Sequence, residues 1–474
     1  MFSSYRELVE RVKSEQIETL DFKVTELSGR WKHLSVPASR MTEKLFRNGF
    51  GFDGSNYGYA RVESSDMVFI PEWSTGFRDP FWETPTLSFL GTVHEIRPEG
   101  FVPYPGDSRV VLQKALDRME SEGVADRFVI GPEFEFHILD SVSYRNDMQA
   151  SGFVLDATEA EWHTHDEAGH LGARVPRKGG YHADAPQDLN RDLRAAMSAA
   201  LERLGIAVKY HHHEVGGPGQ HEIEVVPDDA ARLGDGTMLV KYVVKNLARA
   251  WGKLATFMPK PFFGEAGNGM HVHMQLFKAG EPVFAGLGNA YAGLSETALH
   301  FMGGILTHTA ALSGLASPGT NSYRRLVRGY EAPVAVAFAM GNRSAVIRIP
   351  GYAKAPEDRR FEFRSSDASC NPYLLYAALL AAGMDGIAKG IDPIAAGFGP
   401  LEKNIYEVAD RSLELLPSSL EEALDALERD HDFLLAGGVF PESLIENWVS
   451  MKRLEARRVF EVPTPMEMAL YLDC

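Results

Sequence analysis

The sequence contains very little cysteine. Among its 474 residues only Cys370 and Cys474 are cysteines, so the chain cannot build a framework of disulfide bonds. The N-terminal stretch MFSSYRELVERVKSEQIETLDFKV also lacks the apolar run of a signal peptide, because acids and bases are distributed through it. Both absences are typical of proteins that work in a reducing compartment. The sequence therefore predicts a cytoplasmic protein.

Long hydrophobic runs are also missing. The stretch from Thr297 to Tyr323 holds no Asp, Glu, Lys or Arg, but His300, His308 and Pro318 interrupt it, together with many Ser, Thr and Gly residues. A membrane span needs about 20 predominantly apolar residues. This composition favours a buried helix followed by a loop, and we expect no membrane contact.

Positive charge is scarce in the chain as a whole. Lys and Arg number 48 against 65 Asp and Glu, which gives a formal net charge of -17. Such a protein repels the phosphates of nucleic acids, so a nucleic-acid partner is not expected. The sequence has no Walker A motif, and GNGMHV is not a dinucleotide-binding fingerprint. Any nucleotide must therefore be bound in another way.

The length of the chain favours two domains, because one hydrophobic core rarely serves so many residues. The turn-rich segment EIRPEGFVPYPGDSR offers the best boundary and predicts domains 1–104 and 105–474. The run from Asp140 to Gly180 reads as an irregular excursion. Apolar periodicity predicts helices over 5–15, 108–122, 188–204, 238–257 and 295–315.

Arginines gather in one part of this acidic chain. A guanidinium grips carboxylate or phosphate with two parallel hydrogen bonds, which a lysine cannot do. Any one of these arginines is equally consistent with a solvated surface side chain. Eight among apolar strand-like runs, beside a single lysine, favour a site for anionic small molecules. They are Arg324, Arg325, Arg328, Arg343, Arg348, Arg359, Arg360 and Arg364.

Acids and histidines recur two residues apart in strand-like segments, which places each pair on one face of a strand. A further segment, YHHHEVGGPG, adds Glu214. The pairs are Glu133 and Glu135 in GPEFEF, Glu222 and Glu224 in GQHEIEV, His271 and His273 in GMHVHM, and Glu362 and Arg364 in RFEFR.

Each segment alone also fits an ordinary half-exposed antiparallel sheet. Their repetition, with acids where Thr or Lys is commoner, favours the wall of a cavity. Several carboxylates around one cavity repel each other unless cations lie among them, and oxygen-rich ligands select Mg²⁺ or Mn²⁺ over Zn²⁺. Metal ions beside arginines suit phosphoryl transfer. The pattern predicts ATP-dependent ligation or kinase chemistry.

Over nearly its whole length the chain resembles bacterial type I glutamine synthetase. Each motif is modest alone, but together they follow the order and spacing of that family. The motifs are FDGSN (52–56), GPEFEF, KGGYH, HHHEVGGPGQHE, GNGMHVHMQ, NSYRRLVRGYEAP, NRSAVIRIP, RRFEFR and KNIYE.

The resemblance implies an α+β fold with an N-terminal β-grasp domain. The C-terminal catalytic domain would carry a funnel-like antiparallel sheet flanked by helices, with two divalent ions at its waist. It further implies a homododecamer of two stacked hexameric rings. Each active site would lie between neighbouring subunits, and the FDGSN loop would come from the adjacent one.

The resemblance also implies two sets of metal ligands. Glu135, Glu214 and Glu222 match the ligands of the first ion. Glu133, His271 and Glu362 match those of the second, which lies against the phosphates of ATP. Glu224 matches no ligand of the family, and we expect a solvated or salt-bridged side chain there.

Further residues match substrate positions of the family. Arg325, Arg364, Asn268 and Gly269 match residues that hold glutamate. The nucleotide set comprises Arg343, Arg348, Arg360, His273 and Gln275. The ammonium pocket comprises Asp53, Tyr181 and Glu331.

The implied reaction has two steps, the formation of γ-glutamyl phosphate from glutamate and ATP, and its displacement by ammonia to give glutamine. Asp53 and Glu331 would attract ammonium and accept its proton, and Arg343 would act on the phosphates. An acyl phosphate must be kept from water, and the segment from Gly329 to Glu331 matches the closing flap of the family.

The sequence departs from the family pattern at several positions. Asn56 stands where many relatives have serine, Arg328 where the flap motif has proline, and Lys209 where enteric-type enzymes have an acid that contacts ATP. Gln275 occupies a position that is often serine. These changes leave the metal and phosphate chemistry intact but weaken the identification of the acceptor amine.

Other functions remain open at this stage. A γ-glutamyl-amine ligase acting on polyamines shares the same machinery, although Asp53, Tyr181 and Glu331 favour ammonium. A non-catalytic regulatory paralogue would have lost metal ligands, yet all six are present. A sugar or guanidino kinase is disfavoured by the ordered motifs in both domains.

Tyr406 in KNIYE aligns with the tyrosine that enteric-type enzymes adenylylate. The sequence after it lacks the LPPE that follows the modified tyrosine. An adenylylated residue and a plain surface tyrosine are equally consistent with this segment.

Overall fold

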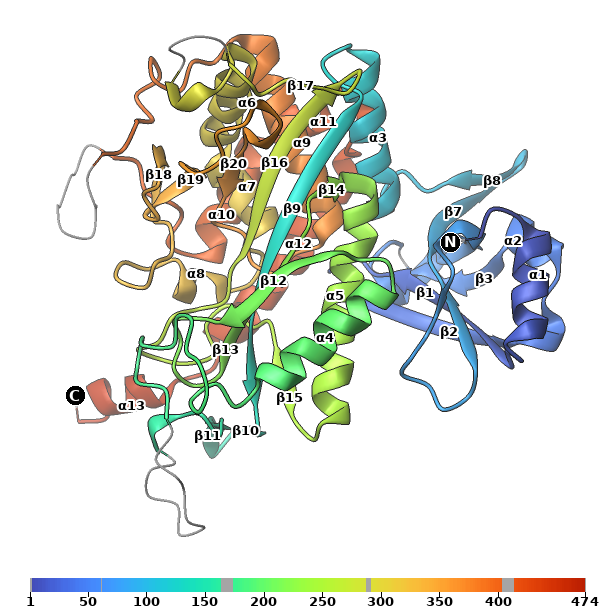
Figure 1. Cartoon of the computed structure of the whole chain (residues 1–474), viewed down its shortest axis with the longest axis horizontal. Coiled ribbons are helices and arrows are strands. Elements are labelled where there is room, and N and C mark those ends of the chain that lie inside the picture. The colour runs from blue at the N-terminus through green and yellow to red at the C-terminus, as the bar shows by residue number, and fades with distance from the viewer. Residues whose placement is uncertain (1, 61, 163–173, 287–290, 403–412, 474) are drawn as a thin grey trace.

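The computed structural model describes residues 2–60, 62–162, 174–286, 291–402 and 413–473. Figure 1 shows a smaller N-terminal part to one side of a larger part built around a long sheet. Helices and strands are mixed throughout the described residues, so the expected α+β fold is confirmed. Within the described residues, no helix is long and apolar enough to span a membrane.

In its described residues, the N-terminal part contains two four-stranded sheets and two α-helices. Strands β2-β1-β6-β5 form one sheet and β3-β4-β7-β8 the other. Phe22, Phe46, Phe69 and Phe89 are buried between these elements. The elements are α1 (Tyr5–Ser14), α2 (Glu43–Asn48), β1 (Thr19–Thr25), β2 (Trp31–Pro37), β3 (Phe50–Asp53), β4 (Asp66–Pro71), β5 (Phe77–Arg78), β6 (Thr86–Phe89), β7 (Gly91–Arg97) and β8 (Gly100–Pro103).

A ten-stranded sheet organises the catalytic part. Its main order is β12-β13-β9-β16-β20-β19-β18, with β14 and β15 paired to β9 and β17 paired to β16. Neighbouring strands are antiparallel except β18 and β19, which are parallel. The strands are β9 (Arg127–Leu139), β12 (Val208–His213), β13 (Gln220–Val225), β14 (Asp228–Asp229), β15 (Leu254–Thr256), β16 (Met270–Lys278), β17 (Glu281–Pro282), β18 (Ala335–Met340), β19 (Ala345–Ile349) and β20 (Phe361–Phe363).

Helices pack on this sheet and extend to the C-terminal end, which lies on the opposite side of the molecule from the N-terminus (Figure 1). They are α3 (Ser108–Ser121), α4 (Arg191–Arg203), α5 (Ala230–Ala250), α6 (Glu296–Thr307), α7 (Thr309–Ala316), α8 (Ser322–Arg325), α9 (Pro372–Lys389), α10 (Leu420–Arg429), α11 (Asp432–Leu435), α12 (Glu442–Phe460) and α13 (Pro465–Tyr471).

Helix α9 forms the centre of the core and is apolar on almost every side. Its N-terminus is fixed by the Asn371 side chain, which accepts hydrogen bonds from two backbone N–H groups, and by Pro372 in the first turn. Gly390 ends it in the left-handed conformation. A Cβ added to Gly304 of α6 would lie 2.1 Å from the carbonyl oxygen of Ala382, so α6 and α9 approach closely only because of glycine.

Three local expectations need correction. The helix expected over 295–315 is two helices, α6 and α7, which meet at His308. The helix expected over 238–257 begins at Ala230 and ends at Ala250, and β15 follows it. The excursion expected from Asp140 begins with an ordered hairpin of β10 (Ser141–Asp147) and β11 (Ala150–Asp156). Most residues of both strands are exposed, so the hairpin has no buried face that an alternation of apolar and polar residues could reveal in the sequence.

A buried polar network joins the two parts of the chain. Lys23 of β1 lies 3.0 Å from an Asp21 carboxylate oxygen and 3.2 Å from one of Asp79. Tyr242 of α5 donates a hydrogen bond to Asp79 at 3.0 Å, and its ring lies 4.3 Å from the Lys23 ammonium. The N-terminal sheet is therefore bonded to a helix of the catalytic part.

Candidate active site

The strand register brings the predicted acids and histidines opposite one another. Glu222 pairs with Glu135 and Glu224 pairs with Glu133 across β13 and β9. On the other side of β9, His271 of β16 lies opposite Glu133. Facing carboxylates on neighbouring strands repel each other. The middle of the sheet therefore carries a concentration of negative charge that calls for cations.

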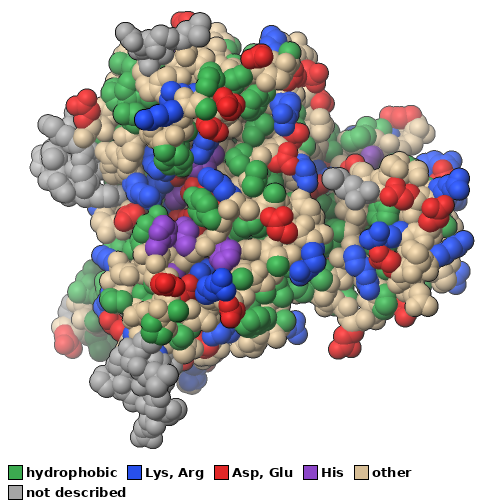
Figure 2. Space-filling view, viewed as in Figure 1, with side chains coloured by type: hydrophobic (Ala, Val, Ile, Leu, Met, Phe, Trp, Pro, Cys, Tyr) green, Lys and Arg blue, Asp and Glu red, His purple; other side chains and the backbone are tan. Residues whose placement is uncertain are grey.

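These strands form one wall of a cavity of about 340 Å³. Figure 2 shows histidines beside acidic and basic side chains in this hollow. The lining combines Glu133, Glu135, Glu214, Glu222, His212 and His271 with Arg325, Arg343, Arg348 and Arg364, and also includes Tyr181, Lys209, Tyr210, Tyr330, Glu331 and Tyr352.

The first group of predicted metal ligands consists of Glu135, Glu214 and Glu222. Burial, followed by the charge of Glu135, raises the pKa of Glu214 to about 8. Burial and the charge of Glu133 raise the pKa of Glu222 well above its ordinary value. His212 adds a nitrogen within 4.8 Å of ligand oxygens from Glu214 and Glu222. Buried carboxylates that repel one another in this way fit a hard divalent cation.

The second group consists of Glu133, His271 and Glu362. The Nδ1 atom of His271 lies 3.0 Å from a Glu133 oxygen and 3.4 Å from a Glu362 oxygen. Burial opposes the charge of Glu133, but His273 and His271 outweigh it and hold the pKa well below its ordinary value. Two anions and an imidazole at these distances also fit a hard divalent cation.

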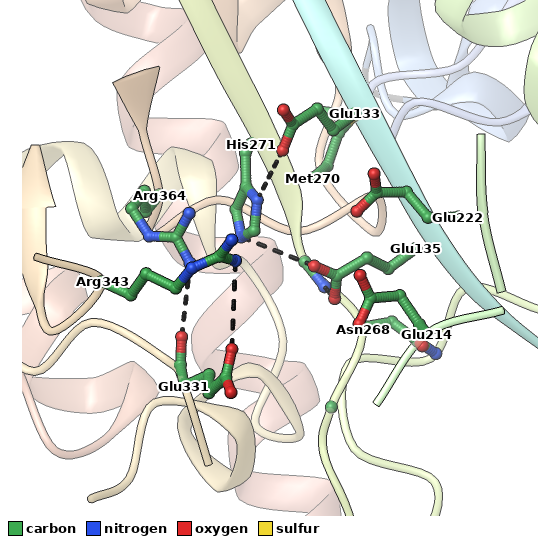
Figure 3. A network of polar contacts seen from close by, with 12 residues as sticks. Glu133, Glu135, Glu214, Glu222, Asn268, Met270, His271, Glu331, Arg343 and Arg364 are labelled. Atoms are coloured by element: carbon green, nitrogen blue, oxygen red, sulfur yellow. Dashed lines mark hydrogen bonds and ion pairs between the residues drawn. The ribbon is translucent and has the colours of Figure 1, made fainter. Parts of the chain in front are cut away.

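Arginines form the opposite wall of the cavity (Figure 3). Arg348 donates to a Glu362 oxygen at 2.6 Å, and Arg364 bonds the other oxygen of the same carboxylate. Burial raises the pKa of Glu362, but Arg364 and neighbouring cations outweigh it and lower the pKa to about 2. Arg325 donates to the carbonyl of Ser366 at 3.1 Å. These guanidinium groups are therefore held rigidly at the cavity.

Glu331 lies across the cavity from the carboxylate wall (Figure 3). Its carboxylate is 3.9 Å from Arg343, and its carbonyl accepts a hydrogen bond from Arg364 at 3.4 Å. The backbone of Glu331 has a φ of +56°, which is uncommon for a residue other than glycine. The preceding Tyr330 ring contacts two ammonium groups, and its centre lies 4.3 Å from that of Lys178 and 3.6 Å from that of Lys260.

Several predicted residues lie behind the cavity wall. The side chain of Asn268 is buried and donates to the carbonyl of Met258 at 2.8 Å, and the backbone N–H of Gly269 donates to Glu135 at 2.6 Å. His273 bonds Glu133 at 2.9 Å. These groups orient the wall from behind.

Gln275 and Arg360 also lie outside the lining of the cavity. The Gln275 side chain donates to the carbonyl of Glu357 at 2.7 Å. Arg360 stacks over Tyr352, which itself lines the cavity.

Arg328 is exposed. Tyr406 falls outside the described residues.

Asp53 does not reach the cavity of its own chain. It lies at the end of β3 in the N-terminal part, and its carboxylate accepts hydrogen bonds from Ser55 and from Asn56 at 2.7 Å. Asn56 thus bonds Asp53 itself.

Lys178 and Lys260 were missed by the reasoning from sequence. Lys178 belongs to the KGGYH motif, which drew attention only for its tyrosine. A contact between side chains so far apart in the sequence leaves no local signal.

A second buried group resembles a metal site but does not fit one. Glu159, His213 and His221 offer ligand atoms within 4.8 Å of one another. However, Arg194 donates to Nδ1 of His221 at 2.9 Å, so the proton of that neutral imidazole is on Nε2, the atom that faces Glu159. A protonated nitrogen cannot bind a metal, and the group is a structural network.

Carboxylates that call for divalent cations, set against arginines suited to phosphate, are typical of enzymes that transfer a phosphoryl group from a nucleoside triphosphate, which include ligases and kinases. Comparison with known proteins makes the assignment specific. Residues 16–96 match the glutamine synthetase β-grasp domain, and residues 105–471 match the glutamine synthetase catalytic domain. The chain belongs to the glutamine synthetase family.

Individual relatives cover the whole chain. A glutamine synthetase of Frankia alni is 42% identical and covers 100% of both chains. A 3-hydroxylaminophenol mutase of Cupriavidus pinatubonensis is 41% identical over 99% of both. The solved structure of Plasmodium falciparum glutamine synthetase has a TM-score of 0.87 at 27% identity and covers 99% of each chain. Relatives of nearly equal identity thus carry different enzyme names.

Proposed function

We propose that this enzyme joins ammonia to the γ-carboxylate of L-glutamate, with ATP converted to ADP and phosphate through γ-glutamyl phosphate. The observation that carries the proposal is the placement of Glu331 and Arg343 across the cavity from the carboxylate wall. We further propose domains 1–104 and 105–474, and a place in the glutamine biosynthesis of the cytoplasm.

The carboxylates are assigned to two Mg²⁺ or Mn²⁺ ions. Glu135, Glu214 and Glu222 would hold one ion. Glu133, His271 and Glu362 would hold the other. When bound, such ions neutralise phosphoryl oxygens and the substrate carboxylate.

The guanidinium groups bind the anionic parts of the substrates. Arg325 and Arg364 are assigned to glutamate, because both are buried at the cavity with their donors fixed. Arg343 and Arg348 are assigned to the transferring phosphate, with Arg360 further along the nucleotide. Asn268, Gly269, His273 and Gln275 support these contacts from behind the wall.

Glu331, Tyr181 and Asp53 are assigned to ammonium. A carboxylate attracts the cation and accepts its proton, which leaves nucleophilic ammonia. Since Asp53 lies outside the cavity of its own chain, we propose that a neighbouring subunit supplies it. This sharing suits a ring assembly, and we propose two stacked hexamers.

Replacing Glu331 by Ala tests the proposed role of the loop. Glutamine formation should fall by about 10²- to 10⁴-fold, while ATP and glutamate still bind, because the proton acceptor is lost and the phosphate site is kept. Binding is measured by calorimetry and turnover by glutamine assay. Unaltered synthesis in the variant would remove Glu331 from the mechanism.

The acceptor is tested by phosphate release with ATP and glutamate while the amine is varied. Ammonium should support turnover at the lowest concentration. Turnover that depends on putrescine but not on ammonium would identify a γ-glutamyl-amine ligase of the same fold. Metal-bound protein without turnover on any amine would favour a regulatory paralogue.

A further inference from the structure

Lys209 reaches the cavity wall because of an irregularity in strand β12. The pairing with β13 passes from Val208 opposite Val225 to Tyr210 opposite Glu224, so Lys209 is the extra residue of a bulge. Bulges next to active sites redirect a side chain. Here the Lys209 ammonium lies 2.6 Å from Oε1 of Glu224, and the residue lines the cavity.

The group around Glu224 has the geometry of a cation site. Ligand atoms of Glu224, Glu133 and His273 lie within 4.8 Å of one another. The Glu224 side chain is 2% exposed, and its second oxygen, Oε2, is buried with no hydrogen-bond partner. Glu224 also lies directly opposite Glu133 in the sheet. Two facing carboxylates with an unsatisfied oxygen require a positive charge.

The two facing pairs of glutamates are neutralised in different ways. Among the ion pairs of the described residues, Glu135 and Glu222 pair only with imidazoles. Glu135 lies 3.7 Å from His271, and Glu222 lies 3.2 Å from His212. Glu224 instead has a full ammonium charge at hydrogen-bond distance. A fixed lysine supplies one positive charge and offers no exchangeable coordination position.

We propose that Lys209 is a tethered cation that takes the place of a further divalent ion at Glu133, Glu224 and His273. Its neutralisation of Glu224 leaves Glu133 oriented toward His271, and Lys209 is therefore a positioning residue. The inference rests on the proposed function in one respect, namely that the neighbouring carboxylates bind metal.

The test counts Mn²⁺ ions on the intact protein by electron paramagnetic resonance, with a non-hydrolysable ATP analogue present. Lys209→Met should bind about one more Mn²⁺ per subunit than the wild type, because the carboxylate pair is then left without its cation. Lys209→Arg should keep the wild-type count. The double variant Lys209→Met, Glu224→Gln should also keep it, because the pair is then no longer doubly charged.

Unchanged counts in Lys209→Met would overturn the inference, and so would a further ion that persists in the double variant. A wild type that binds no Mn²⁺ at all would overturn the proposed metal sites as well, which separates the two failures. The Lys209 side chain is 33% exposed, so its replacement leaves the core intact. If Lys209→Met does not fold, Lys209→Gln serves with the same expected counts.

Discussion

Glu362 holds together the arginine wall of the cavity. Its side chain is fully buried and bonds Arg348 and Arg364. Replacing it by Gln leaves two guanidinium groups short of an anion, which costs about 3–5 kcal/mol for a buried pair. Denaturant unfolding in EDTA should show this loss. Glu357→Gln, at an exposed position, is the matched control and should change the stability little. Equal stability of both variants would show that the two arginines find other partners.

Glu214 makes the metal-free protein sensitive to pH. Its pKa is raised from 4.5 to about 8, so between these values the folded chain keeps a proton that the unfolded chain has released. Stability therefore falls as pH rises from about 5 to 8, because the folded state binds more protons.

The comparison of wild type with Glu214→Gln isolates this effect. In EDTA the melting temperature of the wild type should decline more steeply across that pH range. At pH 8 the wild type should melt at a lower temperature than Glu214→Gln in EDTA. In saturating Mn²⁺ it should melt at a higher temperature, since the metal replaces the proton. Parallel pH profiles in EDTA would contradict the role of Glu214.

At the scale of residues, the sequence predicted much of the wall but not its orientation. Side chains two apart on a strand share a face whatever the partner strand, so the pairs such as Glu133 and Glu135 could be read locally. The direction of the Asn268 side chain depends on hydrogen bonds with His137 and Gln220, which lie far away in the sequence. The contact of Lys209 depends on a bulge, which arises only when β12 pairs with β13.

At the scale of elements, the loop that carries Glu331 is held by its neighbour Tyr330. Cation–π contacts are worth about 0.5–2 kcal/mol each, and this ring has two. Tyr330→Leu removes both and should let water reach the acyl phosphate. The ratio of ATP hydrolysed to glutamine formed should rise roughly 5- to 30-fold.

Tyr330→Phe is the matched control, because it keeps the ring and should keep the coupling near that of the wild type. Lys260→Met should give an intermediate ratio, since Lys178 still contacts the ring. A Phe variant as uncoupled as the Leu variant would assign the effect to the hydroxyl group instead.

The helices and strands were predictable where their burial pattern is regular. The break at His308 was not, because the sequence on both sides continues the apolar pattern. His308 is fixed there by Asp385 at 2.9 Å and Asp430 at 2.8 Å. These acids lie on later segments, so the cause of the break is tertiary.

At the scale of the whole molecule, the proposed shared site allows a complementation test. Asp53→Ala and Glu331→Ala should each be inactive in the homogeneous assembly. Subunits mixed at equal amounts before reassembly should recover about a quarter of the wild-type activity, because random neighbours restore some intact sites. No recovery in verified mixed assemblies would place Asp53 and Glu331 in one chain.

The order of motifs along the sequence predicted both domains and the family. It did not predict how the domains join, because Lys23, Asp79 and Tyr242 are unremarkable in their own segments. Their network forms only when α5 packs on the N-terminal sheet.

The ligand groups are spread widely along the chain, from Glu133 on β9 to Glu362 on β20, which lies between β16 and β19. During synthesis the N-terminal part of the chain emerges first. The carboxylates of β9 then lack the ligand group of β20 while more than two hundred further residues are translated. Metal capture by both proposed groups should therefore require translation to proceed beyond Glu362, and ribosome-bound chains that stop before Phe361 should lack it.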